Sequence, residues 1–230
     1  MGKWHVHVKG LATCIVILVT TLPSVWATAT DRSGPDGPSQ DETLAFIKDT
    51  WEACATMHSG WQRMTAKDGS LWHVDRMARV EVVVMPPSAL RLITRRNERR
   101  RLSGIFEIQT PEELIQEFDL NTLSPDIQPE RAGEDAALYG IRLHCAQAAC
   151  VTEWVASLAI PGKPLHDLKT GKLAVTSLDE LAYVDRAPKS HPGEKKGEAY
   201  VPVCDKVALE SLSKAFAHAI NNAGGKKPLF

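Results

Sequence analysis

An amphipathic helix is predicted near the start of the folded part of the chain, over residues 39–56. Apolar residues recur there three or four positions apart, which places them on one face of a helix. These residues are Leu44, Ile47, Trp51 and Cys54. Ser39 followed by Glu42 forms a capping box, in which each side chain bonds the backbone N–H of the other residue. We therefore expect the helix to begin just after Ser39.

A second helix is predicted near the end of the chain. Asp205 is a typical N-cap residue, and Gly224 with Gly225 provides a stop signal. Between them, apolar residues at helical spacing form one stripe: Leu209, Leu212, Ala215, Phe216, Ala219 and Ile220. This stripe predicts that the helix packs against the core of the domain.

Between the two helices the pattern changes to the two-residue period of β-strands. Residues 78–84 alternate in this way, and Pro86-Pro87 ends the predicted strand. Further strands are predicted at 90–94, 103–108, 138–144 and 151–160, with additional candidates at 173–176 and 181–184. Residues 120–136 and 186–198 are rich in proline, glycine and polar residues, which indicates loops.

One short helix is predicted inside this strand-rich region. Thr110-Pro111-Glu112-Glu113 has the form of a capping box with proline at the first helical position. The carboxylates of Glu112 and Glu113 would also favour the positive end of the helix dipole. We expect the helix to continue to about Phe118.

The order of these elements predicts the fold class. Strands joined by short connections favour antiparallel pairing, and hence an α+β domain. We expect an antiparallel sheet or a partly closed barrel, with an N-terminal helix and a C-terminal capping helix. That topology would resemble a pleckstrin-homology-like module. A single globular domain is expected over residues 39–230, preceded by a flexible linker at 30–38.

Residues 1–29 have the three-part layout of a secretory signal peptide. Lys3 and Lys9 make a basic start, an apolar run follows at 11–19, and the small residues Ala27 and Ala29 mark two cleavage positions. The run is too short for a permanent transmembrane anchor, and no later segment is apolar enough to span a membrane. We therefore expect a periplasmic or secreted protein.

Two other interpretations of this segment stay open. Leu11-Ala12-Thr13-Cys14 resembles the sequence at which bacterial lipoproteins are acylated, although it precedes most of the apolar run. The segment would otherwise form a buried strand or helix of the fold. The lipoprotein interpretation implies a lipid on Cys14.

Composition restricts the class of protein further. The hydrophobic fraction of 43% and the charged fraction of 24% are ordinary for a soluble globular protein. The formal net charge of −1 becomes about −3 when Lys3 and Lys9 leave with the signal peptide. This balance excludes a globally basic nucleic-acid-binding protein.

The cysteines predict a disulfide framework. Four remain after removal of the signal peptide, and four cysteines allow three pairings. Cys145 and Cys150 flank a four-residue loop between two predicted strands, so a hairpin would place them opposite each other. Cys54 is then left to pair with Cys204, which would join the two predicted helices. The alternatives are redox-active thiols, or a zinc site with His144, although the C-x-x-C spacing of such sites is absent.

An arginine cluster extends from the predicted strand 90–94 through the polar turn before the predicted strand 103–108. Six arginines there are opposed only by Glu98: Arg91, Arg95, Arg96, Arg99, Arg100 and Arg101. At a hairpin tip they would concentrate positive charge suited to phosphate or carboxylate groups. We hypothesise that Arg95, Arg96, Arg99, Arg100 and Arg101 form a surface that binds an anionic lipid, a cell-wall polymer or an acidic protein. The alternative is a solvated tip that protects the sheet edge from aggregation.

No catalytic, metal-binding, nucleotide or other cofactor motif is recognised in the sequence. The six histidines of the mature chain lack metal-pair spacing, and a G-x-S-x-G elbow is absent. They are His58, His73, His144, His166, His191 and His218. An enzyme would need a pocket that brings His144 or His166 to a carboxylate. We interpret Trp51, Trp61, Trp72 and Trp154 as core residues, with Trp61 and Trp72 as alternative lining of a surface site.

The end of the chain combines several of these features. Cys204 precedes the last helix, Ala215-Phe216-Ala217-His218 lies within it, and Gly224-Gly225-Lys226-Lys227 follows. This segment of about 27 residues, which ends at Phe230, resembles the close of certain uncharacterised bacterial exported domains. The resemblance implies a domain of unknown function and brings no catalytic residues. Asn221-Asn222 departs from the pattern, since an apolar residue or cysteine is usual there.

The sequence thus predicts an exported, disulfide-stabilised α+β domain that acts as a binding or structural component of the cell envelope. An extracytoplasmic, hydrolase-like enzyme is the alternative. The ligand, the oligomeric state and the cleavage site are not determined by the sequence.

Overall fold

The structure is a computed structural model. It describes residues 37–54, 56–66, 68–102, 106–131, 139–184, 189 and 191–225. The predicted signal peptide, Cys14 and most of the linker 30–38 lie outside the described residues, as do Lys226, Lys227 and Phe230. Pro38–Phe230 forms one compact unit.

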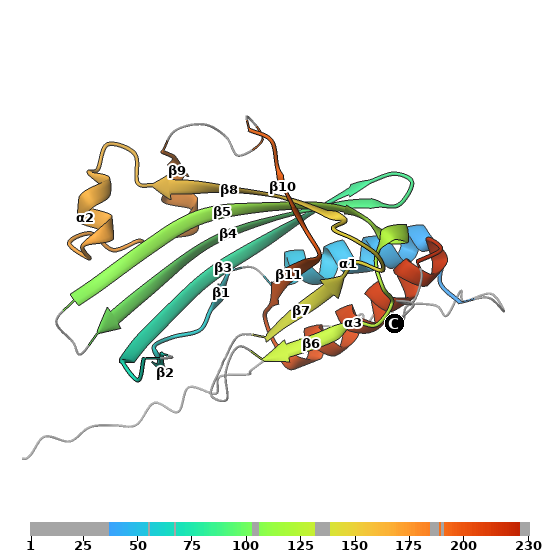
Figure 1. The fold of residues 1–230 in the computed structure, drawn as a ribbon, viewed down its shortest axis with the longest axis horizontal. Helices are drawn as coiled ribbons and strands as arrows, with labels where there is room; N and C mark the ends of the chain where they lie inside the picture. Colours follow the sequence, from blue (N-terminus) through green and yellow to red (C-terminus); the bar gives the residue numbers. More distant parts are fainter. Residues whose placement is uncertain are drawn as a thin grey trace, which may run out of the picture. The chain divides into compact units, whose positions relative to one another are not determined.

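The fold is α+β with antiparallel sheets, as the sequence predicts (Figure 1). The larger sheet contains β1 (Met57–His58), β2 (Gln62–Thr65), β3 (Leu71–Met85), β4 (Ala89–Leu102), β5 (Phe106–Asp119), β8 (Val151–Ala159), β9 (Ala182–Tyr183) and β10 (Glu194–Lys196). The smaller sheet contains β6 (Gln128–Arg131), β7 (Tyr139–His144) and β11 (Glu198–Val203). The helices are α1 (Gln40–Ala53), α2 (Leu165–Lys169) and α3 (Lys206–Asn222), with short 3₁₀ turns η1 (Leu120–Thr122) and η2 (Leu178–Glu180). The two sheets are not closed into a barrel.

Three long strands form the centre of the larger sheet. The strand order is β1-β3-β4-β5-β8-β10, with β2 added on β3 and β9 on β8. β3 and β4 pair without interruption from Trp72↔Leu102 to Met85↔Ala89, around the turn that Pro86-Pro87 makes. We call the side of this sheet that carries Val80 the inner face and the opposite side the outer face.

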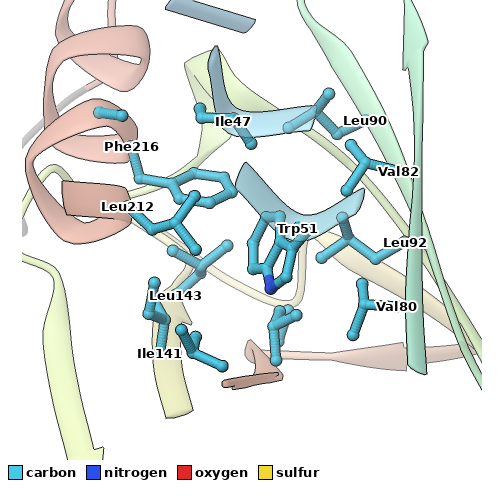
Figure 2. Close-up of a cluster of buried hydrophobic side chains, with 14 of the residues drawn as sticks. Ile47, Trp51, Val80, Val82, Leu90, Leu92, Ile141, Leu143, Leu212 and Phe216 are labelled. Carbon is cyan, nitrogen blue, oxygen red and sulfur yellow. The ribbon is translucent and has the colours of Figure 1, made fainter. Parts of the chain in front are cut away.

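The main core lies between the inner face, α1, α3 and the smaller sheet (Figure 2). Trp51 of α1 is 1% exposed and meets Phe216 of α3 edge to face, with 5.4 Å between the ring centroids. The indole Nε1 of Trp51 donates a 3.1 Å hydrogen bond to the backbone oxygen of Pro202 in β11. The Trp51 side chain therefore links α1 to α3 and to β11. The hydrogen bond to Pro202 also satisfies the indole N–H, which burial would otherwise leave unpaired.

Both terminal helices begin as the sequence predicts. Ser39 and Glu42 form the reciprocal capping box of α1, and the side chain of Asp205 accepts a hydrogen bond from the backbone of Ala208 in α3. Gly224 adopts a positive φ of 84° just beyond α3, a conformation that glycine adopts without steric cost. Among the described residues, no helix is both long and apolar enough to cross a membrane.

The predicted helix at residues 110–118 is wrong, because this segment is part of strand β5. Its glutamates face arginines across the strand pair: Glu112 lies opposite Arg96, and Glu113 lies opposite Arg95. These cross-strand pairs favour the strand over the local capping signal. Pro111 lies just beyond the part of β5 that pairs with β8, so it occupies a stretch with a partner on one side only, where proline is tolerated.

The predicted arginine-rich turn is also wrong. Strand β4 continues through the arginines to Leu102, and β5 begins at Phe106, with residues 103–105 outside the described residues. Extended backbone sends successive side chains to opposite faces of the sheet, which divides the arginines between the inner and the outer face. The strand predicted at 173–176 is not formed, and the strand predicted at 181–184 is limited to β9. The predicted loop 120–136 contains β6, and the predicted loop 186–198 contains β10.

The loop between Cys145 and Cys150 connects two sheets and is not a hairpin turn. β7 pairs with β6 and β11, whereas β8 pairs with β5, β9 and β10. The loop lacks the glycine or asparagine of a tight hairpin turn, which agrees with this outcome. Another crossing between the sheets lies beside it at Gly197, whose carbonyl accepts a 2.8 Å hydrogen bond from the Cys145 N–H.

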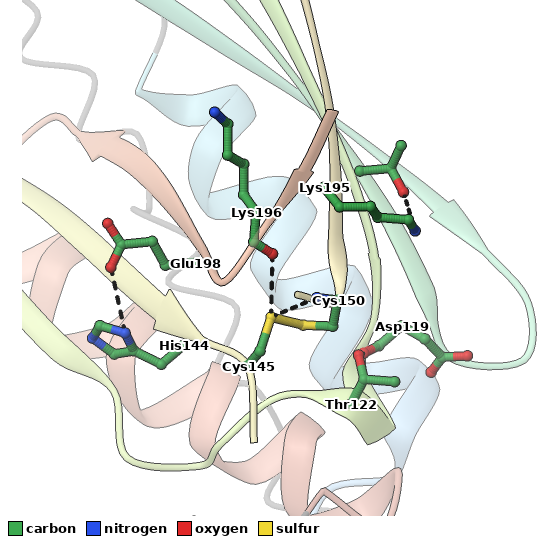
Figure 3. Close-up of a disulfide and its surroundings, with 9 residues drawn as sticks. Asp119, Thr122, His144, Cys145, Cys150, Lys195, Lys196 and Glu198 are labelled. Atoms are coloured by element: carbon green, nitrogen blue, oxygen red, sulfur yellow. Dashed lines mark hydrogen bonds and ion pairs between the residues drawn. A yellow bond between two sulfur atoms is a disulfide. The ribbon is translucent and has the colours of Figure 1, made fainter. Parts of the chain in front are cut away.

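The two predicted cysteine pairs are both disulfides in the structure. Cys54–Cys204 joins the end of α1 to the residue before the cap of α3, and Cys145–Cys150 closes the crossing between the sheets (Figure 3). The zinc and free-thiol alternatives for these cysteines are therefore not compatible with the structure.

The outer face has a smaller core of its own. The segment after β8, which includes α2 and η2, covers part of this face with Leu168, Val175, Leu178 and Leu181. These side chains pack around Leu158 and Met77. The amide of Gln109 on β5 holds the segment in place, because its oxygen accepts a 3.1 Å hydrogen bond from the backbone N–H of Val175.

We predict that the two disulfides contribute unequally to stability. Cys54–Cys204 spans 150 residues and Cys145–Cys150 spans 5. Chain entropy in the unfolded state gives about 5 kcal/mol for the first and about 2 kcal/mol for the second. Urea unfolding of Cys54→Ala/Cys204→Ala and Cys145→Ala/Cys150→Ala should show the larger loss of unfolding free energy in the first variant. Equal losses would contradict the prediction.

Candidate functional site

The arginines of β4 lie on two different surfaces. Arg96 and Arg100 are on the inner face, since they share the parity of Thr94 and Leu92 along the strand. The other arginines of the strand are on the outer face: Arg91, Arg95, Arg99 and Arg101. The five residues hypothesised to form one anion-binding surface are thus not brought together.

The inner-face arginines line a cleft of about 550 Å³ between the larger and the smaller sheet. Beyond the main core, β3, β4 and β5 form its floor, and the smaller sheet forms its wall. Uncharged side chains of Ala78, Leu114 and Pro202 contribute to the lining, together with the charged groups described below. The cleft combines apolar surface with several convergent polar groups, as ligand sites usually do.

The floor carries a ladder of ion pairs. Arg76 Nε lies 2.7 Å from Glu98 Oε2, and Arg100 hydrogen-bonds the other oxygen of the same carboxylate. Arg96 is paired with Glu112 at 2.5 Å. Burial by itself would raise the pKa of Glu98, but the hydrogen bonds and charges of Arg76 and Arg100 outweigh it and lower that pKa. Two arginines share one carboxylate, so this part of the floor has an excess of positive charge.

The wall presents one arginine and one tyrosine. Arg142 Nε donates a 2.6 Å hydrogen bond to Glu130, and its Nη1 bonds Glu198. The hydrogen bond to Glu130 is the main cause of the raised pKa of Arg142. Tyr200 lies beside Arg142 in the register of β7 and β11, with its ring over Gly140, where any side chain would overlap it. Glycine at position 140 is therefore required by the placement of Tyr200.

Tyr200 keeps its proton near neutral pH. Burial raises the pKa of its hydroxyl, and the charge of Glu130 raises it further, against the opposing effect of nearby arginines. Within the described part of the chain, the Tyr200 hydroxyl has no hydrogen-bond partner, and the buried hydroxyl of Thr94 on the floor has none either. Two hydroxyl groups in the cleft are thus available to a ligand.

On the outer face the arginines are tied into structural ion pairs. Arg95 lies 2.7 Å from Glu113, whose side chain is 2% exposed and also accepts a 2.5 Å hydrogen bond from the Tyr183 hydroxyl. Arg91 pairs with Glu117 at 2.5 Å. Arg95 therefore neutralises a buried carboxylate, which is a structural role.

The histidines give a limited basis for an enzyme. His144 Nδ1 lies 3.5 Å from Glu198, but neither residue lines the cleft, and His166 has no ion pair in the described residues. His218 contacts the start of the domain. Its Nε2 lies 2.9 Å from the backbone oxygen of Pro38 and 2.9 Å from Asn222 Nδ2. Across the described ranges, no group of three or more His, Cys, Asp or Glu is arranged to hold a metal ion.

Sequence reasoning missed the wall of the cleft. Arg142, Tyr200 and Glu130 come from strands that are distant along the chain from the β4 arginines. Their charges are isolated in the sequence, and only the packing of one sheet against the other brings them near Arg96. Arg76 lies two residues before the predicted strand 78–84, and its parity with Ala78 is the signal that could have placed it on the same face.

We predict that Tyr200 ionises above the usual tyrosine pKa of about 10. The chain has three tyrosines, so we subtract the absorbance titration of Tyr200→Phe at 295 nm from that of the wild type. The difference reports the ionisation of Tyr200 alone. Its contribution to stability is present below pH 10 and is lost as the pH rises through the folded-state value. The unfolding free energy should therefore fall less above pH 10 in Tyr200→Phe. A difference titration centred at or below 10 in the native protein would contradict this, and the same titration in urea is the control.

Comparison of the chain with protein-family models, with curated proteins and with solved structures finds no match. The resemblance of the C-terminal segment to uncharacterised exported domains therefore stays a prediction. Cys204 and Phe216, which carry it, have structural roles here, in a disulfide and in the main core.

Proposed function

We propose that the protein is an exported component of the cell envelope that binds a ligand with a carboxylate or phosphate group in the cleft between its two sheets. The observation that carries this proposal is the convergence of four arginines from both sheets on one cavity. They are Arg76, Arg96, Arg100 and Arg142. Three glutamates line the same cavity, so its side chains carry one net positive charge: Glu98, Glu112 and Glu130.

The arginines retain donors for a ligand although each is ion-paired. A guanidinium group has five N–H donors in a planar fork, and the ion pairs described use only some of them. Glu98 holds Arg76 and Arg100 on either side of itself, which fixes both groups before a ligand arrives. Preorganised donors lose little side-chain entropy on binding, which favours affinity.

The uncharged part of the cleft suits the body of such a ligand. Ala78, Leu114 and Pro202 give apolar contact, and the hydroxyls of Thr94 and Tyr200 can hydrogen-bond polar atoms. A volume of about 550 Å³ is in the range of small-molecule sites. The proposal is therefore a small amphipathic anion, or the anionic end of a longer molecule.

Binding is favoured over acid–base catalysis by the state of the cleft carboxylates. Arg76 and Arg100 lower the pKa of Glu98, so this group is ionised near neutral pH and is a weak base. A general acid or base works best with a pKa near the working pH, which neither Glu98 nor Tyr200 has.

Two features support an extracytoplasmic location. Residues 1–29 have the layout of a signal peptide, and two disulfides are persistent in oxidising compartments but rare in the cytosol.

We expect the protein from the native cell to lack the first 27 or 29 residues and to contain no reactive thiol before reduction. Reduction under denaturing conditions should then release four thiols, one for each of the bridged cysteines. N-terminal sequencing and thiol titration of the periplasmic and secreted fractions test this. Intact protein with reactive cysteines in the cytosolic fraction would contradict export.

We predict that Arg96→Ser/Arg100→Ser weakens binding of an anion by at least about tenfold, because each charge-assisted hydrogen bond contributes about 1.5–3 kcal/mol. The probes are phenylacetate and its uncharged amide, phenylacetamide, measured by isothermal titration calorimetry at low ionic strength. The wild type should bind the anion more tightly than the amide, and inorganic phosphate should compete. A wild type that does not distinguish the two probes would contradict the proposal.

The matched control is Arg91→Ser/Arg101→Ser, which removes two charges from the same strand but from the outer face. In this variant Glu117 keeps Lys189 and Glu107 keeps Arg99, so no carboxylate is left without a partner. Binding of phenylacetate should be nearly unchanged. An equal loss in both variants would mean that net charge, and not the cleft, determines binding. Arg100→Ser alone, in which Glu98 keeps Arg76, serves if the double variant is unstable.

A further inference from the structure

An exposed tryptophan lies on the outer face of the larger sheet, away from the cleft. Trp61 is 41% exposed, although the sequence pattern suggested a core residue or a surface-site residue. Its ring rests on two guanidinium groups, with Arg99 at 5.0 Å and Arg101 at 4.7 Å from the ring centroid. Because Trp61 is 41% exposed, part of its ring remains open to solvent beside these two guanidinium groups.

A network of ion pairs holds this arrangement in place. Glu107 accepts hydrogen bonds from both Arg99 and Arg101, each at 2.9 Å. Burial by itself would raise the pKa of Glu107, but these two hydrogen bonds outweigh it and lower that pKa. Arg99 also lies 3.6 Å from Asp75, a carboxylate with 5% exposure that His58 Nε2 contacts at 2.8 Å. The guanidinium groups of Arg99 and Arg101, which contact the Trp61 ring, are therefore held in place by carboxylates.

Two basic side chains beside the ring point to solvent. His58 is 54% exposed. Arg63 of β2 is exposed and lies next to His73 in the strand register, on the same face as Arg101. Within the described ranges Arg63 has no ion pair. This surface has one net positive charge, because it contains the two carboxylates of Glu107 and Asp75 and three arginines, which are Arg63, Arg99 and Arg101.

The chemistry of this surface selects its ligand. The exposed part of an indole ring offers a flat apolar surface, on which the C–H face of a sugar ring can stack. Two cations already contact the Trp61 ring, so a further cation would be repelled, whereas an uncharged or anionic group would not. Arg63 is then placed to bind an anionic substituent of the sugar through its planar fork of donors.

We propose that Trp61, Arg63 and His58 form a second binding site, for a polysaccharide whose sugar rings carry anionic groups. Trp61 stacks on a sugar ring, Arg63 pairs with its carboxylate or phosphate, and the exposed imidazole of His58 bonds a neighbouring hydroxyl. This site is independent of the cleft, because alternate residues of β4 support the two and project from opposite faces. Attachment to an acidic glycan would hold the protein in the envelope while the cleft remains open.

The test uses the mature protein and three matched oligosaccharides: oligogalacturonate, its methyl ester and a neutral dextran oligosaccharide. Binding is followed by calorimetry, and by the fluorescence difference between the wild type and Trp61→Phe, which isolates Trp61 from the other tryptophans. We expect Trp61→Ala to weaken oligogalacturonate binding at least tenfold. Arg63→Ser and methyl esterification should each weaken it severalfold and reduce its dependence on salt.

Lys214→Ser is the matched control, because it removes one exposed positive charge of α3 that belongs to neither proposed site, and it should bind oligogalacturonate like the wild type. Arg63→Ser removes an exposed side chain without an ion pair, so it tests the site even if Trp61→Ala is poorly folded. A glycerol phosphate polymer distinguishes a need for the sugar ring from a need for negative charge alone, and it should bind more weakly than oligogalacturonate. The proposal is overturned if the wild type does not bind oligogalacturonate, if the neutral dextran binds equally well, or if Trp61→Ala and Arg63→Ser bind like the wild type.

Discussion

The structure depends on cross-strand pairing between the arginines of β4 and the glutamates of β5. Arg91, Arg95 and Arg96 each meet a glutamate at 2.5–2.7 Å. A strand with so many like charges would repel itself and its neighbours if these charges were unpaired, and an adjacent strand of opposite charge removes that cost. Because the strands alternate their side chains, the pairing occurs on both faces at once. It extends the larger sheet beyond the helices and supplies charged groups to the cleft on one side and to the Trp61 surface on the other.

The same pairing explains which parts of the fold could be predicted from the sequence. The terminal helices have signals that are local and complete, namely the Ser39 capping box, the Asp205 cap and the apolar stripes, and the structure has both helices. Residues 110–118 have a local helix signal as well, but Glu112 and Glu113 find their partners on β4, and a local pattern does not contain that information. The arginines at 95–101 suggested a turn because charge runs are usually solvated, whereas the structure neutralises them within a strand. Pairing of the cysteines was predictable by elimination, even though the hairpin assumed for Cys145 and Cys150 is not present.

The candidate site was predictable only in part, because it is formed by two sheets. Arg96 and Arg100 were among the residues expected to bind an anion, and they line the cleft. Arg95 was also expected to bind an anion, yet it neutralises the buried Glu113 on the outer face. Tyr200 and Arg142 enter the cleft because the smaller sheet and the larger sheet share the main core with α1 and α3, where Trp51 donates a hydrogen bond to the backbone of Pro202 in β11. The packing of one sheet against another is a tertiary property, and no short sequence segment encodes it.

The three chain crossings between the sheets, from β5 to β6, from β7 to β8 and from β10 to β11, also have a structural consequence. The Cys145–Cys150 loop lies beside Gly197, whose carbonyl accepts a hydrogen bond from the Cys145 N–H, and beside the connection from β5 to β6, where Leu123 forms a β-bridge with Cys145. Because backbone hydrogen bonds join these three connections, the two sheets are held together where the chain crosses between them. The wall of the cleft is thereby kept in place against its floor, although no strand of the smaller sheet pairs with a strand of the larger one in the described residues.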